Sequence, residues 1–141
     1  MDNEPRLGLL IKFIHHAIKK DCDSMLREID LTFSQFDVLM YLLNNQDKAH
    51  NQRDIEKEFM IKNPTVTGIL NRLEAKGFIR RAASQDDARY KKIILTEKSR
   101  QIEKKVHKNG DRIEERLTQG ISPGEKEQLG RLLKIMLKNF S

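Results

Sequence analysis

The spacing of apolar residues along the chain predicts a mostly helical fold. From Leu7 to Ile29, apolar side chains recur at steps of three and four residues, which places them on one face of a long amphipathic helix. The same periodicity returns in five later segments. We therefore expect helices over roughly 5–28, 33–45, 52–60, 63–76, 97–119 and 123–139.

Capping residues support three of these helix starts. Thr32 is followed three residues later by Gln35, and Ser122 by Glu125. A hydroxyl at the N-cap with Glu or Gln three residues on satisfies two backbone N–H groups reciprocally. Both pairs therefore predict capping boxes, and Thr96 is expected to cap the helix that follows it.

The helix over 63–76 has the clearest start and stop signals in the chain. Asn63 is expected to be its N-cap and Pro64 its first helical residue. Proline suits that position because the N–H group it lacks would have no hydrogen-bond partner within the helix. Gly77 is expected to end it in the left-handed conformation. Beyond Gly77 the period changes, and the runs 78–83 and 90–95 predict a β-hairpin with a polar tip.

This order of elements is that of a winged helix-turn-helix flanked by longer helices, so the predicted fold class is mainly α with a β wing. We expect one domain over 1–141, with a DNA-binding lobe at 31–96. The flanking segments 1–30 and 97–141 are expected to dimerise the chain, because the stripe at the C-terminus would otherwise stay exposed. An intrachain three-helix pack without a dimer is the alternative.

The charge composition favours a polyanion as the binding partner. The chain has 27 Lys and Arg against 21 Asp and Glu, a formal net charge of +6, which favours nucleic acid or an anionic membrane surface. Neither an apolar run of spanning length nor a signal peptide is apparent, and the single Cys22 suits a reducing compartment, so we expect a cytoplasmic protein. Glycine-loop, nucleophile-elbow and HExxH motifs are absent, which argues against an enzyme, and we expect no cofactor.

Two surfaces carry features that suit DNA. The outer arc of the 63–76 helix has short polar and basic residues and no acid, as a helix in a major groove requires, although a merely solvated face is the alternative. The hairpin concentrates cations, for which protection of a strand edge is the alternative reading. These hairpin cations are Arg80, Arg81, Arg89, Lys91 and Lys92.

Three motifs in order resemble the MarR (multiple antibiotic resistance regulator) family over essentially the whole chain. LTFSQFDVLMYL (31–42) is similar to its second helix, and NPTVTGILNRLEAKGFIRR (63–81) to its recognition helix and the turn into the wing. DARYKKIILT (87–96) resembles its wing signature. The resemblance implies a homodimer on a pseudo-palindromic operator in double-stranded DNA, usually a repressor that a small molecule, a metal or an oxidant releases.

The resemblance also implies roles for particular residues. Thr65, Thr67 and Asn71 would face bases, Arg72 would contact a base or a phosphate, and Arg89 would enter the minor groove, aimed by an ion pair with Asp87. Together with flanking positions, the implied DNA-binding set is Asn63, Pro64, Thr65, Thr67, Gly68, Asn71, Arg72, Arg80, Arg81, Asp87, Arg89 and Lys91. Gly68 departs from the family pattern, since many relatives place an Arg there.

An effector site is harder to predict. The family cleft between the dimer helices and the lobe implies Phe13, His15, His16, Phe36 and Met40 as candidates, although a core or surface role is the alternative for each. His15 and His16 point about 100° apart on a helix, so no metal site is expected. The competing function is a helical protein-binding or membrane-surface module, which the alternating acids of the 97–119 helix disfavour.

Overall fold

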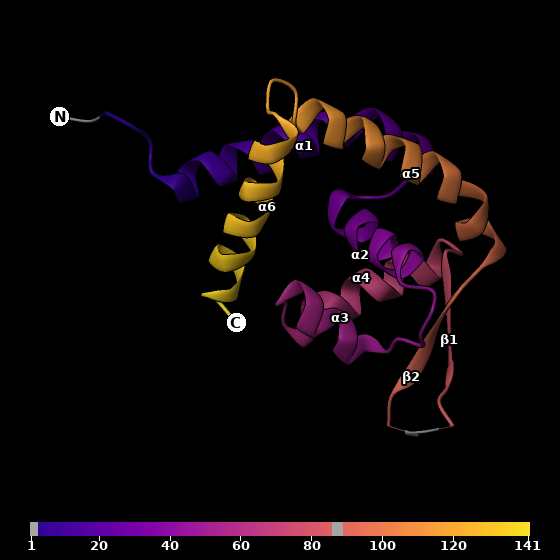
Figure 1. Cartoon of the computed structure of the whole chain (residues 1–141). Helices are drawn as coiled ribbons and strands as arrows, with labels where there is room; N and C mark the ends of the chain where they lie inside the picture. Colours follow the sequence, from indigo (N-terminus) through magenta and orange to yellow (C-terminus); the bar gives the residue numbers. More distant parts are fainter. Residues whose placement is uncertain (1–2, 86–88) are drawn as a thin grey trace. The chain divides into compact units, whose positions relative to one another are not determined.

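The computed structural model describes residues 3–85 and 89–141 and contains every predicted helix and strand (Figure 1). Two compact units form, one up to Asn109 and one from Gly110 to Ser141, and α5 runs from the first into the second. The elements are α1 (Leu7–Ile29), α2 (Phe33–Asn44), α3 (Gln52–Phe59), α4 (Asn63–Ala75), β1 (Ile79–Ala83), β2 (Lys91–Leu95), α5 (Glu97–Leu117) and α6 (Pro123–Lys138).

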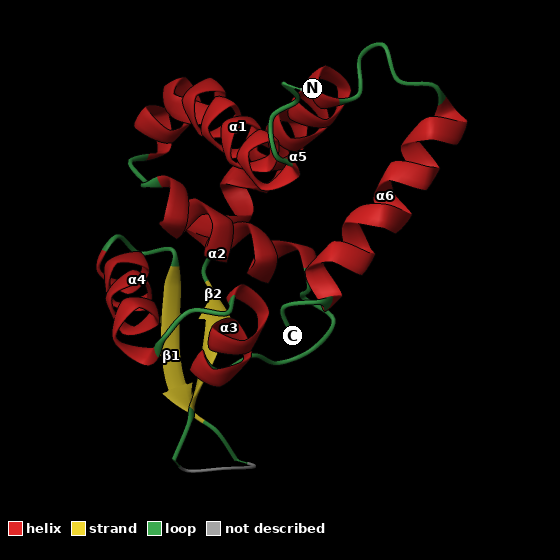
Figure 2. Cartoon of the chain, turned by 90° about the vertical axis from the view of Figure 1, so that its left-hand side faces the viewer, coloured by secondary structure: helices red, strands yellow, loops and turns green. Residues whose placement is uncertain are grey.

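The hydrophobic core of the first unit lies where α2, α3 and α4 meet the two strands (Figure 2). Its largest fully buried side chains include Leu39 from α2, Ile55 from α3, Leu70 and Leu73 from α4, and Phe78 just before β1. The helical residues come from predicted apolar stripes and Phe78 from the predicted hairpin run 78–83, and burial of one such side chain contributes roughly 1.5–3 kcal/mol. The helix-turn-helix and the wing therefore share one core.

The wing is a two-stranded antiparallel sheet with a third contact at its base. Ile79 pairs with Leu95 and Ala83 with Lys91. In addition, the N–H of Ile93 donates to the carbonyl of His50 at 2.8 Å, which forms an isolated bridge between β2 and the segment before α3. The base of the wing is thereby hydrogen-bonded to the helix-turn-helix.

The C-terminus of α4 ends as the sequence predicts. Gly77 has φ +83°, in the left-handed region. The N–H of Phe78 donates to the carbonyl of Leu73 at 2.9 Å, and that of Gly77 to Glu74 at 3.0 Å. These two bonds form a Schellman motif, which satisfies the last helical carbonyls and directs the chain into β1.

The N-terminus of α4 begins one residue earlier than predicted. Asn63 is the first helical residue rather than the N-cap, and Pro64 is the second. Lys62 is the N-cap, because its carbonyl accepts from the N–H groups of Thr65 and Val66 at 3.1 and 3.3 Å. The Asn63 side chain bonds instead to α3, which leaves this end without a side-chain cap.

Both predicted capping boxes are present, at Thr32 with Gln35 and at Ser122 with Glu125. At the start of α5, the Thr96 carbonyl accepts from the N–H of Arg100, while its hydroxyl donates to the Gly77 carbonyl at 2.6 Å. Thr96 thus connects α5 to the turn that ends α4.

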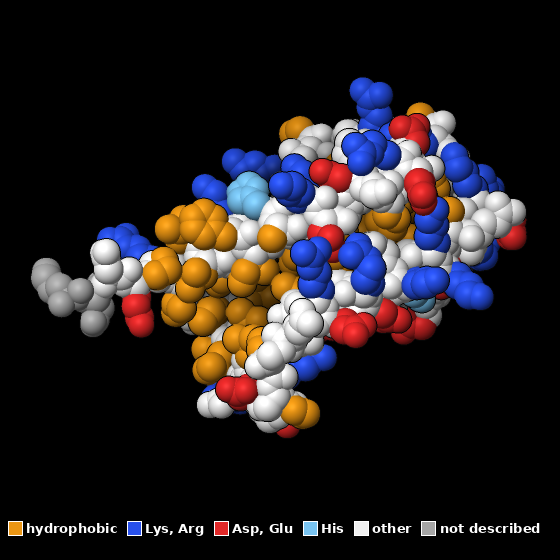
Figure 3. Space-filling model, turned by 90° about the horizontal axis from the view of Figure 1, so that it is seen from above, with side chains coloured by type: hydrophobic (Ala, Val, Ile, Leu, Met, Phe, Trp, Pro, Cys, Tyr) orange, Lys and Arg blue, Asp and Glu red, His pale blue; other side chains and the backbone are white. Residues whose placement is uncertain are grey.

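Two apolar stripes lie on the surface of the single chain. In the first unit, the N-terminal half of α1 exposes Leu7, Leu10 and Phe13, and orange side chains gather near this end in Figure 3. In the second unit, no residue of α6, all of which the structure describes, is buried, and Leu133 and Leu137 are exposed. No described helix is both long enough and apolar enough to cross a bilayer.

Candidate nucleic-acid interface

Helix α4 has one buried face and one exposed face, as its periodicity predicts. Val66, Ile69, Leu70 and Leu73 are buried. The outer face exposes Pro64, Thr65, Gly68, Asn71 and Arg72. At Gly68 an added Cβ would meet no atom within 4 Å, so the surface is open at the position where many relatives carry Arg.

A set of hydrogen bonds joins α3 to the start of α4. The Gln52 amide nitrogen donates to the Thr67 hydroxyl at 2.8 Å. The Asn63 amide nitrogen donates to a Glu56 carboxylate oxygen at 3.3 Å. Thr67 and Asn63 are thus partly engaged within the protein, whereas Thr65 lies on the exposed surface. Sequence spacing gives no sign of a role for Gln52, because its partner is on another helix.

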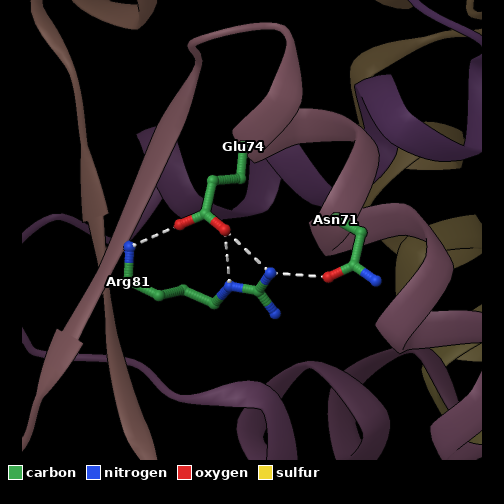
Figure 4. A network of polar contacts seen from close by, with 3 residues as sticks. All are labelled: Asn71, Glu74 and Arg81. Carbon is green, nitrogen blue, oxygen red and sulfur yellow. Dashed lines mark hydrogen bonds and ion pairs between the residues drawn. The ribbon is translucent and has the colours of Figure 1, made fainter.

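Arg81 of β1 is bound to two residues of α4 (Figure 4). Its backbone N–H and its guanidinium donate to the Glu74 carboxylate, with a guanidinium contact at 2.9 Å. The same terminal nitrogen donates to the Asn71 side-chain oxygen at 2.5 Å. Sequence spacing gave no sign of this network, which forms only because the turn at Gly77 brings β1 back beside α4.

The Arg81 network changes the electrostatics of α4. Hydrogen bonds from Arg81 lower the pKa of the Glu74 carboxyl, against a smaller effect of burial. Glu74 is the only acidic residue in α4, and its partly exposed side chain corrects the prediction that the outer arc of this helix carries no acid. Its ion pair with Arg81 balances its negative charge within the protein. The Arg81 side chain is thus paired with Glu74. The other predicted contact residues of the wing, Arg80 and Lys91, are exposed.

At the wing, Tyr90 brings two arginines together. The guanidinium carbon of Arg53, from α3, lies 5.0 Å from the centroid of the Tyr90 ring, and that of Arg89 lies 5.5 Å from it. Arg53 also donates to the Tyr90 hydroxyl at 3.0 Å. The predicted partner of Arg89, Asp87, lies outside the described residues. Arg53 and Tyr90 were not predicted as site residues, and no spacing rule connects them.

These features border a single groove. It lies between α3, α4 and the wing, and its lining includes Arg53, Thr67, Arg81, Arg89 and Lys91. The predicted recognition helix and wing thus contribute to one groove, to which α3 adds Arg53 and Glu56. Among the described residues, four cationic residues and one acidic residue line it, so the groove is basic on balance.

The predicted effector residues do not share one environment. Phe36 is buried in the core, Met40 is half-buried, and Phe13, His15 and His16 are exposed. The cavity between the end of α1 and the start of α2 is lined by other residues, among them Lys19, Arg27 and Lys76. The His15 ring lies 5.5 Å from that of Phe33, edge to face. An effector role for these residues remains a prediction.

Cys22 is buried, as its place in the apolar stripe suggests, and the Asn109 amide nitrogen donates to its sulfur at 3.6 Å. Burial in an apolar stripe favours an inert thiol. Within residues 3–85 and 89–141, no three His, Cys, Asp or Glu side chains gather as metal ligands would.

Helices α2 to α4 with the two-stranded sheet make this chain a winged helix-turn-helix protein. The model of the MarR family matches residues 29–89. The HTH-type transcriptional regulator SarZ of Staphylococcus haemolyticus is 31% identical over 134 residues, which are 95% of this chain and 88% of that protein. The chain therefore belongs to the MarR family and is a winged helix-turn-helix regulator.

Solved structures agree with this assignment. The structure of an S. aureus MepR–DNA complex has a TM-score of 0.87 and 32% identity, and the match covers 96% of this chain and 99% of that one. The MarR regulator from Oenococcus oeni PSU-1 has a TM-score of 0.81 and 33% identity, with 94% and 99% covered. The predicted family and fold class are confirmed.

Proposed function

We propose that this chain is a homodimeric repressor that binds a pseudo-palindromic operator in double-stranded DNA and leaves it when a small-molecule effector binds. The observation that carries the proposal is the exposed face of α4, whose one acidic residue, Glu74, is paired with Arg81, and which borders the basic groove with α3 and the wing. A major groove admits a helix with this chemistry, since a carboxylate facing phosphate would be repelled. The similarity to MepR, solved as a DNA complex, supports the same reading.

Within this proposal, residues divide by the part of DNA they contact. Thr65 and Asn71 face base edges, with Arg72 at a base or a phosphate. Arg53 and Arg89, held on the Tyr90 ring, contact the backbone and the minor groove beside the wing. Phosphate contacts fix the position of the protein, and base contacts provide sequence specificity.

The dimer part of the proposal rests on uncovered apolar surface. Exposed leucines on the N-terminal half of α1 and along α6 form stripes that a soluble monomer would leave in water. A second copy of the chain covers both stripes with one self-complementary interface. Two protomers then read two half-sites centred about one helical turn apart, ~34 Å.

The test is selection of bound duplexes from a random double-stranded library by the full chain. We expect a consensus with two-fold symmetry and a dimer by sedimentation at micromolar concentration. Leu133→Asp with Met136→Asp, on the α6 stripe, should yield a monomer that loses most of its operator affinity. Lys134→Asp, on the same helix, changes charge without touching the stripe and is the matched control. A stable wild-type monomer, or a consensus without symmetry, would contradict the dimer model.

A further inference from the structure

The contact between Arg81 and Asn71 bears on how this chain would choose its base sequence. We propose that Arg81 is a positioning residue that holds the Asn71 amide with its oxygen turned toward β1 and its nitrogen toward DNA. Asn71 then donates to a hydrogen-bond acceptor on a base edge and does not pair bidentately with adenine. The proposal rests on the proposed function, because it concerns the DNA surface of α4.

The chemistry of the two groups fixes which amide atom faces Arg81. A guanidinium has only donors, whereas the amide has an acceptor oxygen and a donor nitrogen. The oxygen must therefore face Arg81, and it lies 2.5 Å from the guanidinium nitrogen. Charge-assisted bonds of this kind are shorter and stronger than neutral ones. The amide nitrogen points away from Arg81 in Figure 4, on a residue that is exposed.

Arg81 is itself held in place, which allows it to orient a neighbour. Its backbone N–H donates to one Glu74 oxygen at 3.0 Å, and its side chain donates to the other at 2.9 and 3.3 Å. The guanidinium is consequently fixed from both ends of the residue. Asn71 and Glu74 are one helical turn apart, so a single arginine bridges both.

Base edges differ in what they offer such an amide. An asparagine that reads adenine bidentately accepts from the 6-amino group and donates to N7, so both amide atoms must face the base. Guanine presents two acceptors in the major groove, and thymine presents O4. Adenine also presents N7, but its 6-amino donor finds no acceptor on Asn71 when the amide oxygen is directed toward β1. Asn71 therefore favours guanine or thymine over adenine at the position it contacts.

The experiment compares duplex selections by the full chain and its variants. Asn71→Ala identifies the contacted position as the one whose preference disappears. Arg81→Lys keeps the positive charge, but a single ammonium cannot reproduce the forked contact to Glu74 and Asn71. It should reduce discrimination at that same position roughly threefold to tenfold, the effect of one hydrogen bond, and leave the other positions unchanged. Arg100→Lys, on the exposed surface of α5, is the matched control and should alter no preference.

A measurement on the wild-type chain keeps the test valid if Arg81→Lys does not fold. Duplexes with each base at the contacted position are compared, together with 2′-deoxynebularine, a purine without the 6-amino group. Preference for guanine or thymine supports the proposal. A preference for adenine overturns it if replacing adenine with 2′-deoxynebularine lowers the binding affinity as much as Asn71→Ala does. An Arg81→Lys variant that folds and keeps full discrimination at that position also overturns it. If no duplex is selected at all, the proposed function itself fails.

Discussion

The Arg53 guanidinium lies over the Tyr90 ring, 5.0 Å from its centroid, and donates to the hydroxyl of the same residue at 3.0 Å. This contact joins α3 to the wing and places Arg53 on the same ring as Arg89. Two guanidiniums against one aromatic ring concentrate positive charge at the wing, and cation–π contacts of this kind contribute about 0.5–1 kcal/mol at exposed sites. A DNA phosphate beside the wing would be attracted by both cations.

Arg53→Ala should weaken binding to the selected operator and to random duplex DNA alike. Loss of one phosphate-neutralising cation per protomer should reduce the salt slope of the binding constant by about one unit per protomer. Fluorescence anisotropy over a salt series measures both effects. Arg53→Lys retains the charge and should retain the slope, and Arg100→Ala, on exposed α5, should change neither. A slope unaltered by Arg53→Ala would remove this residue from the interface.

Arg89→Ala should lower the affinity for both duplexes and the salt slope by similar amounts. If Asp87 aims Arg89 at the minor groove, a further prediction follows for Asp87. An anion near DNA repels phosphate, so its deletion should improve binding unless it serves to aim Arg89. We expect Asp87→Ala to reproduce part of the Arg89→Ala loss at matched salt. Equal or stronger binding by Asp87→Ala would show that no functional ion pair exists between the two residues.

The ion pair of Glu74 should make stability depend on pH. Because Arg81 lowers the pKa of Glu74 in the folded state, its stabilisation is present above the unfolded value of about 4.5 and is lost as pH falls through the lower folded value. Glu74→Gln should therefore reduce the Tm at pH 5–7 and have progressively less effect below pH 4.5. Glu115→Gln, an exposed position on α5, is the control. A Tm difference that stays constant down to pH 3 would contradict this account.

Replacing two glycines of the DNA-binding lobe by alanine should change the stability of the fold in opposite directions. Gly68 lies within α4 with open space around it, so Gly68→Ala should stabilise the fold by about 0.5–1 kcal/mol. Gly77 has φ +83°, and Gly77→Ala should destabilise it by about 1–2 kcal/mol. Urea unfolding at one protein concentration measures both, since a dimer's stability depends on concentration. The same sign for both variants would be inconsistent with the observed backbone.

Local rules predicted most of the fold and part of the site. The capping box at Thr32 and the stop at Gly77 depend on neighbours a few residues away, and both are observed. The buried and exposed faces of α4 follow from helical periodicity alone. The contact of Arg81 with Asn71 and that of Arg53 with Tyr90 could not be predicted, because they join residues from different elements. The shifted start of α4 has the same origin, since Asn63 bonds to Glu56 of α3 instead of capping its own helix.

The most direct test of the account is an equilibrium titration of the full chain against its selected operator and against a scrambled duplex of equal length and composition, at physiological salt. The account predicts tighter binding to the operator by about a thousandfold or more, as sequence-specific DNA-binding proteins show. It also predicts that Asn71→Ala removes a larger part of operator affinity than of random affinity, because base contacts carry the discrimination. Equal affinity for the two duplexes would contradict it.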